Sequence, residues 1–141
     1  MFLKQCDVLS QRDAKMETPL RLAYMGDAIY EALIREYLIR KNANTVNKLH
    51  REAVKYVKAS CQANVLMEIL EKLEDDEREV VRRGRNAKSA TIPKNAVLID
   101  YKNATGFEAL IGYLYLQGKQ DRIYDLVKEA VAIIEKGENN A

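Results

Sequence analysis

The sequence contains few of the residues that build most metal sites and nucleophilic sites. Its 141 residues include one histidine, His50, and two cysteines, Cys6 and Cys61. A single histidine gives little basis for a histidine metal cage or for Ser-His or Cys-His catalysis. The two cysteines match no metal-binding spacing and no disulfide framework, which is typical of a reducing compartment such as the cytoplasm. Any hydrolytic chemistry must therefore depend mainly on carboxylates.

Prolines, glycines and long apolar runs are also scarce. With two prolines and six glycines in the whole chain, long helices are expected. No apolar run approaches the roughly 18 residues of a membrane span, and the N-terminus lacks the apolar segment of a signal peptide. Hydrophobic residues make up 48% of the chain and charged residues 31%. This composition predicts a soluble single domain over residues 1–141 that does not associate with a membrane.

Apolar residues recur at three- and four-residue steps through most of the chain, which predicts an all-α helical bundle. Thr18 and Pro19 are suited to begin the first long helix, as N-cap and first helical residue. The helix at 102–116 is apolar nearly all round and should be the buried central one. Residues 1–16 are expected to form a leader and residues 138–141 a frayed tail. The expected helices span 19–40, 45–73, a shorter segment capped by Asp75 or Asp76 and ending near residues 83–84, 102–116 and 121–136. An extended loop is expected at 85–95, and residues 97–99 should return to the core.

Charges of opposite sign are separated along the chain. Residues 68–79 contain seven acids and two bases, whereas residues 80–99 contain five bases and no acid. The net charge of +2 conceals this reversal, which indicates a polyanionic partner for the basic segment. That segment mixes bases with amide and hydroxyl side chains and has no aromatic residue for stacking on single-stranded bases. A solvated surface loop would have the same composition, but duplex RNA is recognised through these groups by contacts to phosphates and 2′-hydroxyls. The candidate RNA-binding residues are Arg82, Arg83, Arg85, Asn86, Lys88 and Ser89.

Two isolated carboxylates, Asp27 and Glu108, occupy otherwise apolar helical stretches. Neither has a Lys or Arg three or four residues away, where a helical neighbour could neutralise it. Each acid could point to solvent or pair with an arginine from a distant helix. A divalent metal facing both acids would satisfy them together, because an unpaired buried carboxylate is costly. Oxygen ligands without histidine favour Mg²⁺, with Mn²⁺ as a substitute, and such ions usually act on phosphates.

Two neighbours of Asp27 bear on this site. Glu31 lies one helical turn after Asp27 and is either a solvated surface acid or a metal contact through water. Gly26 is unusual in a strong helix, where glycine costs about 1 kcal/mol relative to alanine. It either permits close packing of a second helix or leaves room for a ligand beside the acid, and both interpretations can hold together.

The sequence around each acid resembles a motif of the ribonuclease III family. Residues 22–28, Leu-Ala-Tyr-Met-Gly-Asp-Ala, resemble its signature helix, whose pattern is roughly Leu-Glu-Phe-Leu-Gly-Asp-Ala. Residues 107–112, Phe-Glu-Ala-Leu-Ile-Gly, match its second catalytic segment. Since no double-stranded-RNA-binding domain is expected after these motifs, the resemblance narrows to the Mini-ribonuclease III family. It implies that Asp27 and Glu108 are the catalytic and metal-binding acids.

The resemblance also implies an activity and its partners. It implies a cytoplasmic, Mg²⁺-dependent endoribonuclease that cuts double-stranded RNA by attack of a metal-activated water on the phosphodiester and matures the large-subunit (23S) ribosomal RNA precursor. A ribosomal protein that presents this substrate is a further candidate partner. The enzyme would be a homodimer, because cutting both strands of a duplex requires two acidic sites related by a two-fold axis. Tyr24 and Met25 are the expected interface residues.

Two positions depart from the family pattern. The signature glutamate four residues before the aspartate is Ala23 in this chain, and the acid three residues before Glu108 is Thr105. Half of the usual carboxylate quartet is therefore missing, and Glu31 or ordered water could substitute. These losses favour an alternative function, a non-catalytic duplex-RNA-binding or scaffolding dimer. The survival of Asp27 and Glu108 in apolar settings favours the enzyme. A helical protein-interaction module would explain the core but neither the acids nor the basic segment.

Overall fold

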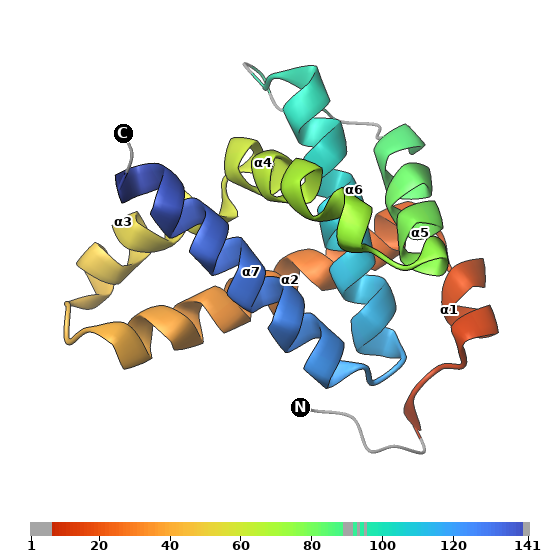
Figure 1. The fold of residues 1–141 in the computed structure, drawn as a ribbon, viewed down its shortest axis with the longest axis horizontal. Helices are drawn as coiled ribbons and strands as arrows, with labels where there is room; N and C mark the ends of the chain where they lie inside the picture. The colour runs from red at the N-terminus through yellow and green to blue at the C-terminus, as the bar shows by residue number, and fades with distance from the viewer. Residues whose placement is uncertain (1–6, 89–91, 93, 95, 140–141) are drawn as a thin grey trace.

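A computed structural model describes residues 7–88, 92, 94 and 96–139, and over these residues the regular secondary structure is entirely helical. The helices are α1 (Gln11–Met16), α2 (Pro19–Lys41), α3 (Val46–Val57), α4 (Ala59–Ile69), a 3₁₀ turn η2 (Leu70–Lys72), α5 (Asp75–Asn86), α6 (Leu98–Leu116) and α7 (Gln120–Asn139). The all-α prediction is confirmed. Figure 1 shows α2, α4 and α5 arranged around α6, with α7 lying across the bundle.

The central position of α6 follows from its sequence. Twelve of its residues are buried, on all sides of the helix, so it presents no polar face to solvent over most of its length. Phe107 at its centre packs edge-on against Tyr30 of α2, with ring centroids 5.0 Å apart. The predicted buried helix is therefore confirmed, although it begins at Leu98, four residues earlier than expected. The prediction that residues 97–99 return to the core is wrong. Val97, Leu98 and Ile99 are all exposed, because the first turn of α6 projects beyond its neighbours.

The helix ends follow local capping chemistry. Thr18 Oγ1 accepts a hydrogen bond from the Arg21 backbone N–H (3.3 Å) and Pro19 is the first residue of α2, as predicted. The cap expected at Asp75 or Asp76 is instead Glu74, whose backbone N–H donates to Glu77 Oε1 (2.8 Å). Gly118, with φ +73°, ends α6 and permits the turn into α7.

The helix predicted at 45–73 is in fact two helices and a 3₁₀ turn. The backbone becomes extended at Lys58 (ψ 151°), which ends α3 and begins α4. The buried face shifts at this break, because α4 buries Gln62, Leu66 and Ile69, which do not continue the spacing of the buried residues Ala53 and Tyr56 in α3. The leader and the tail also differ from expectation. Residues 11–16 form α1, and α7 continues through Asn139, while residues 1–6 and 140–141 lie outside the described residues.

Two polar clusters attach α7 to the rest of the bundle. Glu135 accepts hydrogen bonds from Tyr37 Oη (2.6 Å), Lys41 Nζ (2.8 Å) and Tyr56 Oη (2.9 Å), which joins α7 to α2 and α3. At the other end of α7, Arg122 donates to both oxygens of Glu77 on α5, from Nε at 2.9 Å and from Nη2 at 2.8 Å.

The Glu77–Arg122 pair makes stability depend on acid pH. Burial alone would raise the pKa of Glu77, but the Arg122 fork and the Glu74 N–H outweigh burial and hold this pKa below its usual value. Replacement of Glu77 by glutamine is expected to lower the free energy of unfolding at pH 7 by about 3 kcal/mol, because it leaves Arg122 partly buried and unpaired. Because the pKa of Glu77 is lower in the folded protein than its unfolded value of 4.5, ionised Glu77 stabilises the fold above pH 4.5. This stabilisation is lost as the pH falls through the pKa that Glu77 has in the folded protein.

Urea denaturation of wild type and Glu77→Gln at pH 7 and pH 3 measures this effect, and the difference should be much smaller at pH 3. The matched control is Glu79→Gln, since Glu79 forms an exposed ion pair with Arg82 on the same helix and should change stability very little. A loss of equal size at both pH values for Glu77→Gln would contradict the ionic role of this carboxylate.

Candidate active site

Asp27 on α2 and Glu108 on α6 are brought together by two glycines at the crossing of these helices. A Cβ atom at Gly26 would lie 1.7 Å from the backbone carbonyl oxygen of Glu108, and one at Gly112 would lie 2.0 Å from that of Leu22. Only glycine allows the two backbones to approach this closely. The close-packing interpretation of Gly26 is therefore confirmed. The alternative, that Gly26 leaves room for a ligand, is wrong, because the backbone of α6 fills the space.

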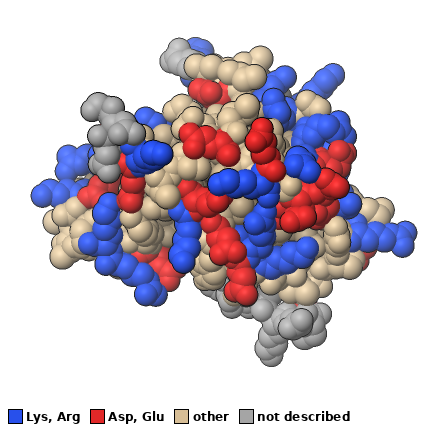
Figure 2. Space-filling view, viewed as in Figure 1, with Lys and Arg blue, Asp and Glu red and all other residues tan. Residues whose placement is uncertain are grey.

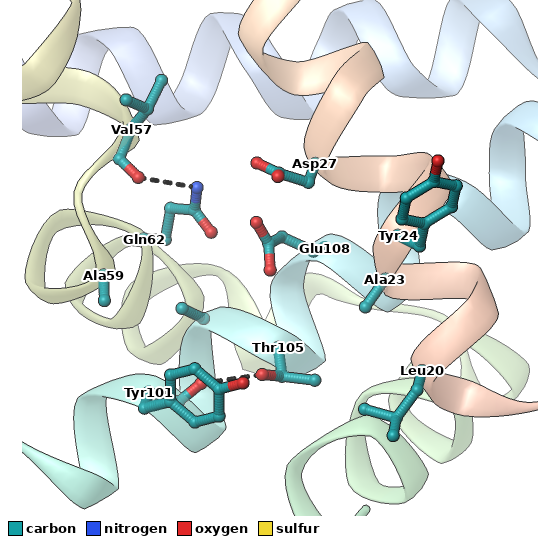
Figure 3. A pocket seen from close by; sticks show the side chains of 11 residues that line it. Leu20, Ala23, Tyr24, Asp27, Val57, Ala59, Gln62, Tyr101, Thr105 and Glu108 are labelled. Atoms are coloured by element: carbon teal, nitrogen blue, oxygen red, sulfur yellow. Dashed lines mark hydrogen bonds between the residues drawn. The ribbon is translucent and has the colours of Figure 1, made fainter. Parts of the chain in front are cut away.

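The two carboxylates face each other across a cavity of about 460 Å³. Figure 3 shows Asp27 and Glu108 pointing toward one another from α2 and α6. Asp27 is exposed and Glu108 is half-buried, so only Glu108 is in the desolvated setting that the sequence predicted for both. Within the described residues, none of the ion pairs includes either acid.

The electrostatics of the pair favour a bound cation. Burial, the largest cause, raises the pKa of Glu108 to about 9 together with hydrogen bonding to Asp27 and the charge of Asp27. A hydrogen bond between the Gln62 side chain and Glu108 lowers this pKa. Two carboxylates in contact cannot both ionise easily without a positive charge between them. A divalent ion would remove this repulsion and allow both acids to be charged.

A third polar group, Gln62 of α4, lines the same cavity. Its side chain is almost completely buried (1% exposed), and its Nε2 donates to the backbone carbonyl of Val57 (3.0 Å). Its Oε1 is buried and has no hydrogen-bond donor among the described residues. Figure 3 shows this oxygen turned toward Glu108. The cavity therefore presents carboxylate and amide oxygens, a donor set that fits a hard cation such as Mg²⁺.

Sequence reasoning missed Gln62, although a signal was present. Residues 62, 66 and 69 share one face of a helix, and this face is otherwise apolar, with Leu66 and Ile69 fully buried. A glutamine in register with such residues is a buried amide that needs partners. The break at Lys58 obscures this signal, because it shifts the buried face between α3 and α4.

The positions where the family pattern has further acids also line the cavity. Ala23 and Thr105 are both buried there, and the Thr105 hydroxyl donates to the Tyr101 backbone carbonyl (2.9 Å). Glu31 does not take their place. It does not line the cavity, and it forms an ion pair with Arg35 (3.0 Å). Among the described residues, no group of three or more His, Cys, Asp or Glu side chains could hold a metal.

The candidate RNA-binding residues lie mainly on the last turns of α5, because this helix continues to Asn86, beyond the end predicted near residues 83–84. Arg82 is exposed and pairs with Glu79, whereas Arg83 donates to the backbone carbonyls of Lys15 (2.6 Å) and Glu17 (3.4 Å) and so holds α1. Arg85 is half-buried over Gly106 of α6. Asn86 and Lys88 are exposed, and Ser89 lies outside the described residues. None of the described residues among these candidates lines the acidic cavity.

The two charged segments are in contact where they meet on α5. Arg82 of the basic segment pairs with Glu79 of the acidic segment, and Lys72 of the acidic segment pairs with Glu129 of α7. Figure 2 shows Lys and Arg side chains interspersed with Asp and Glu over the face in view. The exposed arginine Arg82 of α5 therefore has an acidic side chain next to it.

The two predicted interface residues differ in exposure. Tyr24 is 84% exposed and lines the rim of the cavity, whereas Met25 is half-buried and packs against the hydrophobic core. Leu20 also lines the cavity and is partly exposed at 38%. The candidate contact surface thus lies beside the acids on α2. In the part of the chain that the structure describes, no helix has the length and apolarity required to cross a membrane.

Comparisons with known proteins show the family of the chain. The family model of the Ribonuclease III domain matches residues 20–119. Mini-ribonuclease 3 from Brevibacillus brevis is 52% identical over 124 residues, which cover 88% of this chain and 92% of that protein. Mini-ribonuclease 3 from Clostridium tetani is 46% identical over 132 residues, covering 93% and 87%. A crystal structure of a Fusobacterium nucleatum protein has a TM-score of 0.76 at 32% identity, covering 89% of this chain and 98% of that one.

The helical fold and the match over residues 20–119 define a ribonuclease III domain. The chain belongs to the ribonuclease III family, among the Mini-ribonuclease 3 proteins, and is an endoribonuclease. The family is generally metal-dependent, which agrees with the oxygen donors that line the cavity.

Proposed function

We propose that this chain is an Mg²⁺-dependent endoribonuclease that cleaves double-stranded RNA. The observation that carries the proposal is the pairing of Asp27 and Glu108 across an open cavity, with no ion pair to neutralise either acid among the described residues. These two carboxylates would hold the cation, and Mn²⁺ would substitute for Mg²⁺. When bound, the cation polarises the scissile phosphodiester and lowers the pKa of the attacking water.

The chain's own residues prepare the site for this reaction. The α2–α6 crossing fixes the two acids through backbone contact, so the spacing of the carboxylates is set before RNA binds. The exposure of Asp27 leaves one side of the pair open to a phosphate, while the burial of Glu108 lowers the local dielectric. The expected products carry 5′-phosphate and 3′-hydroxyl ends.

The direct test incubates the purified protein with a long RNA duplex, with and without Mg²⁺. Cleavage that requires Mg²⁺ and leaves the single-stranded form of the same RNA largely intact would support the proposal. Binding of the duplex without cleavage at any Mg²⁺ or Mn²⁺ concentration would contradict the proposal.

We further propose a homodimer with Tyr24 at its two-fold axis. A large tyrosine with 84% of its surface exposed beside the catalytic acids is suited to a self-complementary contact. Replacement of Tyr24 by aspartate is expected to shift the protein from dimer to monomer and to reduce double-strand cleavage strongly. Light scattering at the assay concentration measures the mass. Tyr124→Asp on α7, another partly exposed tyrosine, is the control. A wild-type monomer that remains fully active would exclude this arrangement.

The exposed bases at the end of α5 are proposed to contact RNA phosphates or 2′-hydroxyls. Arg82 and Lys88 are the best pair to test, because Arg83 holds α1 and Arg85 packs over α6. The double variant Arg82→Ala/Lys88→Ala should weaken binding to duplexes of any sequence. It should also flatten the dependence of log K on log salt concentration by about 0.9 per lost contact, as calibrated on B-form DNA.

Fluorescence anisotropy at several salt concentrations measures both quantities for this double variant. Cleavage at saturating RNA should change much less than binding, since these bases position the duplex and do not hold the cation. The control is Lys128→Ala/Lys136→Ala, which removes the same charge from another helix, α7. An unchanged affinity and slope for Arg82→Ala/Lys88→Ala would mean that the duplex binds elsewhere, with the basic end of α2 around Arg35, Arg40 and Lys41 as the next candidate.

The proposed physiological substrate is the 23S ribosomal RNA precursor in the cytoplasm, with a ribosomal protein as a candidate partner that presents it. The named relatives support the general activity, whereas this substrate follows only from the resemblance of the two motifs to the family. Primer extension on ribosomal RNA from cells depleted of the protein tests the substrate, and unprocessed 23S ends should accumulate.

A further inference from the structure

We infer that Gln62 supplies a third oxygen to the divalent cation site, in place of the acids that are absent at positions 23 and 105. The inference rests on the proposed metal-dependent function and adds to it a residue from α4, the third helix around the cavity. The side-chain amide of Gln62 has an oxygen that can bind a cation as a carboxylate oxygen does, and it lines the same cavity as Asp27 and Glu108.

The orientation of this amide is fixed by the break between α3 and α4. In a continuous helix the Val57 carbonyl would accept from the backbone N–H of Cys61, but here Cys61 N–H donates to Lys58 (3.0 Å) instead. The Val57 carbonyl oxygen instead accepts a hydrogen bond from Gln62 Nε2 (3.0 Å). The opposite amide orientation would place two acceptor oxygens against each other. The nitrogen is therefore directed at the backbone, and the oxygen is directed into the cavity.

The structure shows no hydrogen bond from a described residue to this oxygen. Gln62 is 1% exposed, and its Oε1 has no donor among residues 7–88, 92, 94 and 96–139. Buried polar atoms in native proteins nearly always have partners, so an orphaned one indicates a missing ligand, ion or water. The charged groups that share the cavity with it are both carboxylates, which attract a cation and repel an anion. A cation, or a water that the cation orients, is the partner that matches all three oxygens.

Glu31 is excluded from this role by its position. It pairs with Arg35 and does not line the cavity, whereas Gln62 does. Gln62 contributes an oxygen without adding negative charge, so the site can hold a cation with only two acids. This arrangement explains how the chain can dispense with carboxylates at Ala23 and Thr105.

The test compares three variants that separate the oxygen from the hydrogen bond to Val57. Gln62→Met removes both the oxygen and the donor at nearly the same volume, whereas Gln62→Glu keeps the oxygen and removes the donor. Gln62→Asn keeps the amide but withdraws it by one methylene. Circular dichroism and thermal melting establish that each variant folds.

Mn²⁺ binding to the RNA-free protein is measured by electron paramagnetic resonance, and the Mg²⁺ concentration for half-maximal duplex cleavage is measured in parallel. We expect Gln62→Met and Gln62→Asn to weaken metal affinity about 10- to 100-fold in either measurement. Cleavage at saturating Mg²⁺ should recover substantially. Gln62→Glu should bind metal as tightly as wild type or more tightly.

Two other results would contradict, respectively, the role of Gln62 and the proposed metal dependence. If Gln62→Met folds and keeps wild-type metal affinity, whether or not it melts earlier, Gln62 does not contribute to the cation site and the inference fails, while the proposed function stands. If the wild-type protein cleaves duplex RNA equally well in the presence of a chelator, the proposed metal dependence itself fails.

Discussion

Asp27→Asn and Glu108→Gln are each expected to reduce cleavage of duplex RNA by about 1000-fold or more while the protein still folds. Each change removes one of the two charges proposed to hold the cation, and electrostatic stabilisation of a reacting phosphate is worth several kcal/mol. Cleavage of a labelled duplex under single-turnover conditions measures the rate, and circular dichroism checks the fold. Glu36→Gln is the control, since Glu36 is an exposed acid on the same helix as Asp27, paired with Arg40. Near wild-type cleavage by either variant would remove that acid from the catalytic site.

The same acids give the metal-free protein a pH-dependent weakness. The folded pKa of Glu108, about 9, is above its unfolded value of 4.5. The stability that this group contributes is complete below the unfolded pKa and is lost as pH rises through the folded pKa. Glu108→Gln does not titrate, so in chelator it should gain melting temperature relative to wild type as pH rises from about 5 to 9. Added Mg²⁺ should reverse the order, because only wild type binds it well. A constant difference over this range would contradict the burial of an ionisable Glu108.

Gly26→Ala is expected to cause the largest loss of stability of any single-methyl addition in this protein. Its Cβ would lie 1.7 Å from the carbonyl oxygen of Glu108, so α2 and α6 must separate by more than an ångström. Overpacking usually costs about 1–3 kcal/mol, and a backbone clash of this kind should cost about 3 kcal/mol or more. The separation also moves Asp27 away from Glu108, and a displacement of this size can reduce a rate about 100-fold.

Urea denaturation and duplex cleavage measure the two effects of Gly26→Ala. Gly137→Ala on α7 is the matched control. No described atom lies within 4 Å of the position that its new methyl group would take, so this change should be neutral or slightly stabilising through helix propensity. Gly112→Ala, which brings a methyl group within 2.0 Å of the Leu22 carbonyl, should behave like Gly26→Ala. Normal stability and activity for Gly26→Ala would show that the two backbones are not in contact at this crossing.

The sequence predicted the helical class and the two acids because both depend on short-range patterns. Apolar periodicity identified α2, α6 and α7, and the lack of neighbouring bases singled out Asp27 and Glu108. Prediction from the sequence failed for features that depend on contacts between distant segments of the chain. The break at Lys58 has no proline or glycine to announce it, and the exposure of Asp27 depends on where α2 meets α6. Gln62 was missed for the same reason, since only the packed structure places α4 beside the acids.

Because main-chain atoms set the distance between the two acids, this distance is largely independent of side chains elsewhere on α2 and α6. The outer surfaces of both helices can therefore change in sequence without altering the alignment of the carboxylates. For protein engineering, this separates the choice of RNA from the alignment of the reactive groups. RNA preference can be redesigned on the surface, and the reactive centre need not be tuned again, provided that Gly26 and Gly112 are retained.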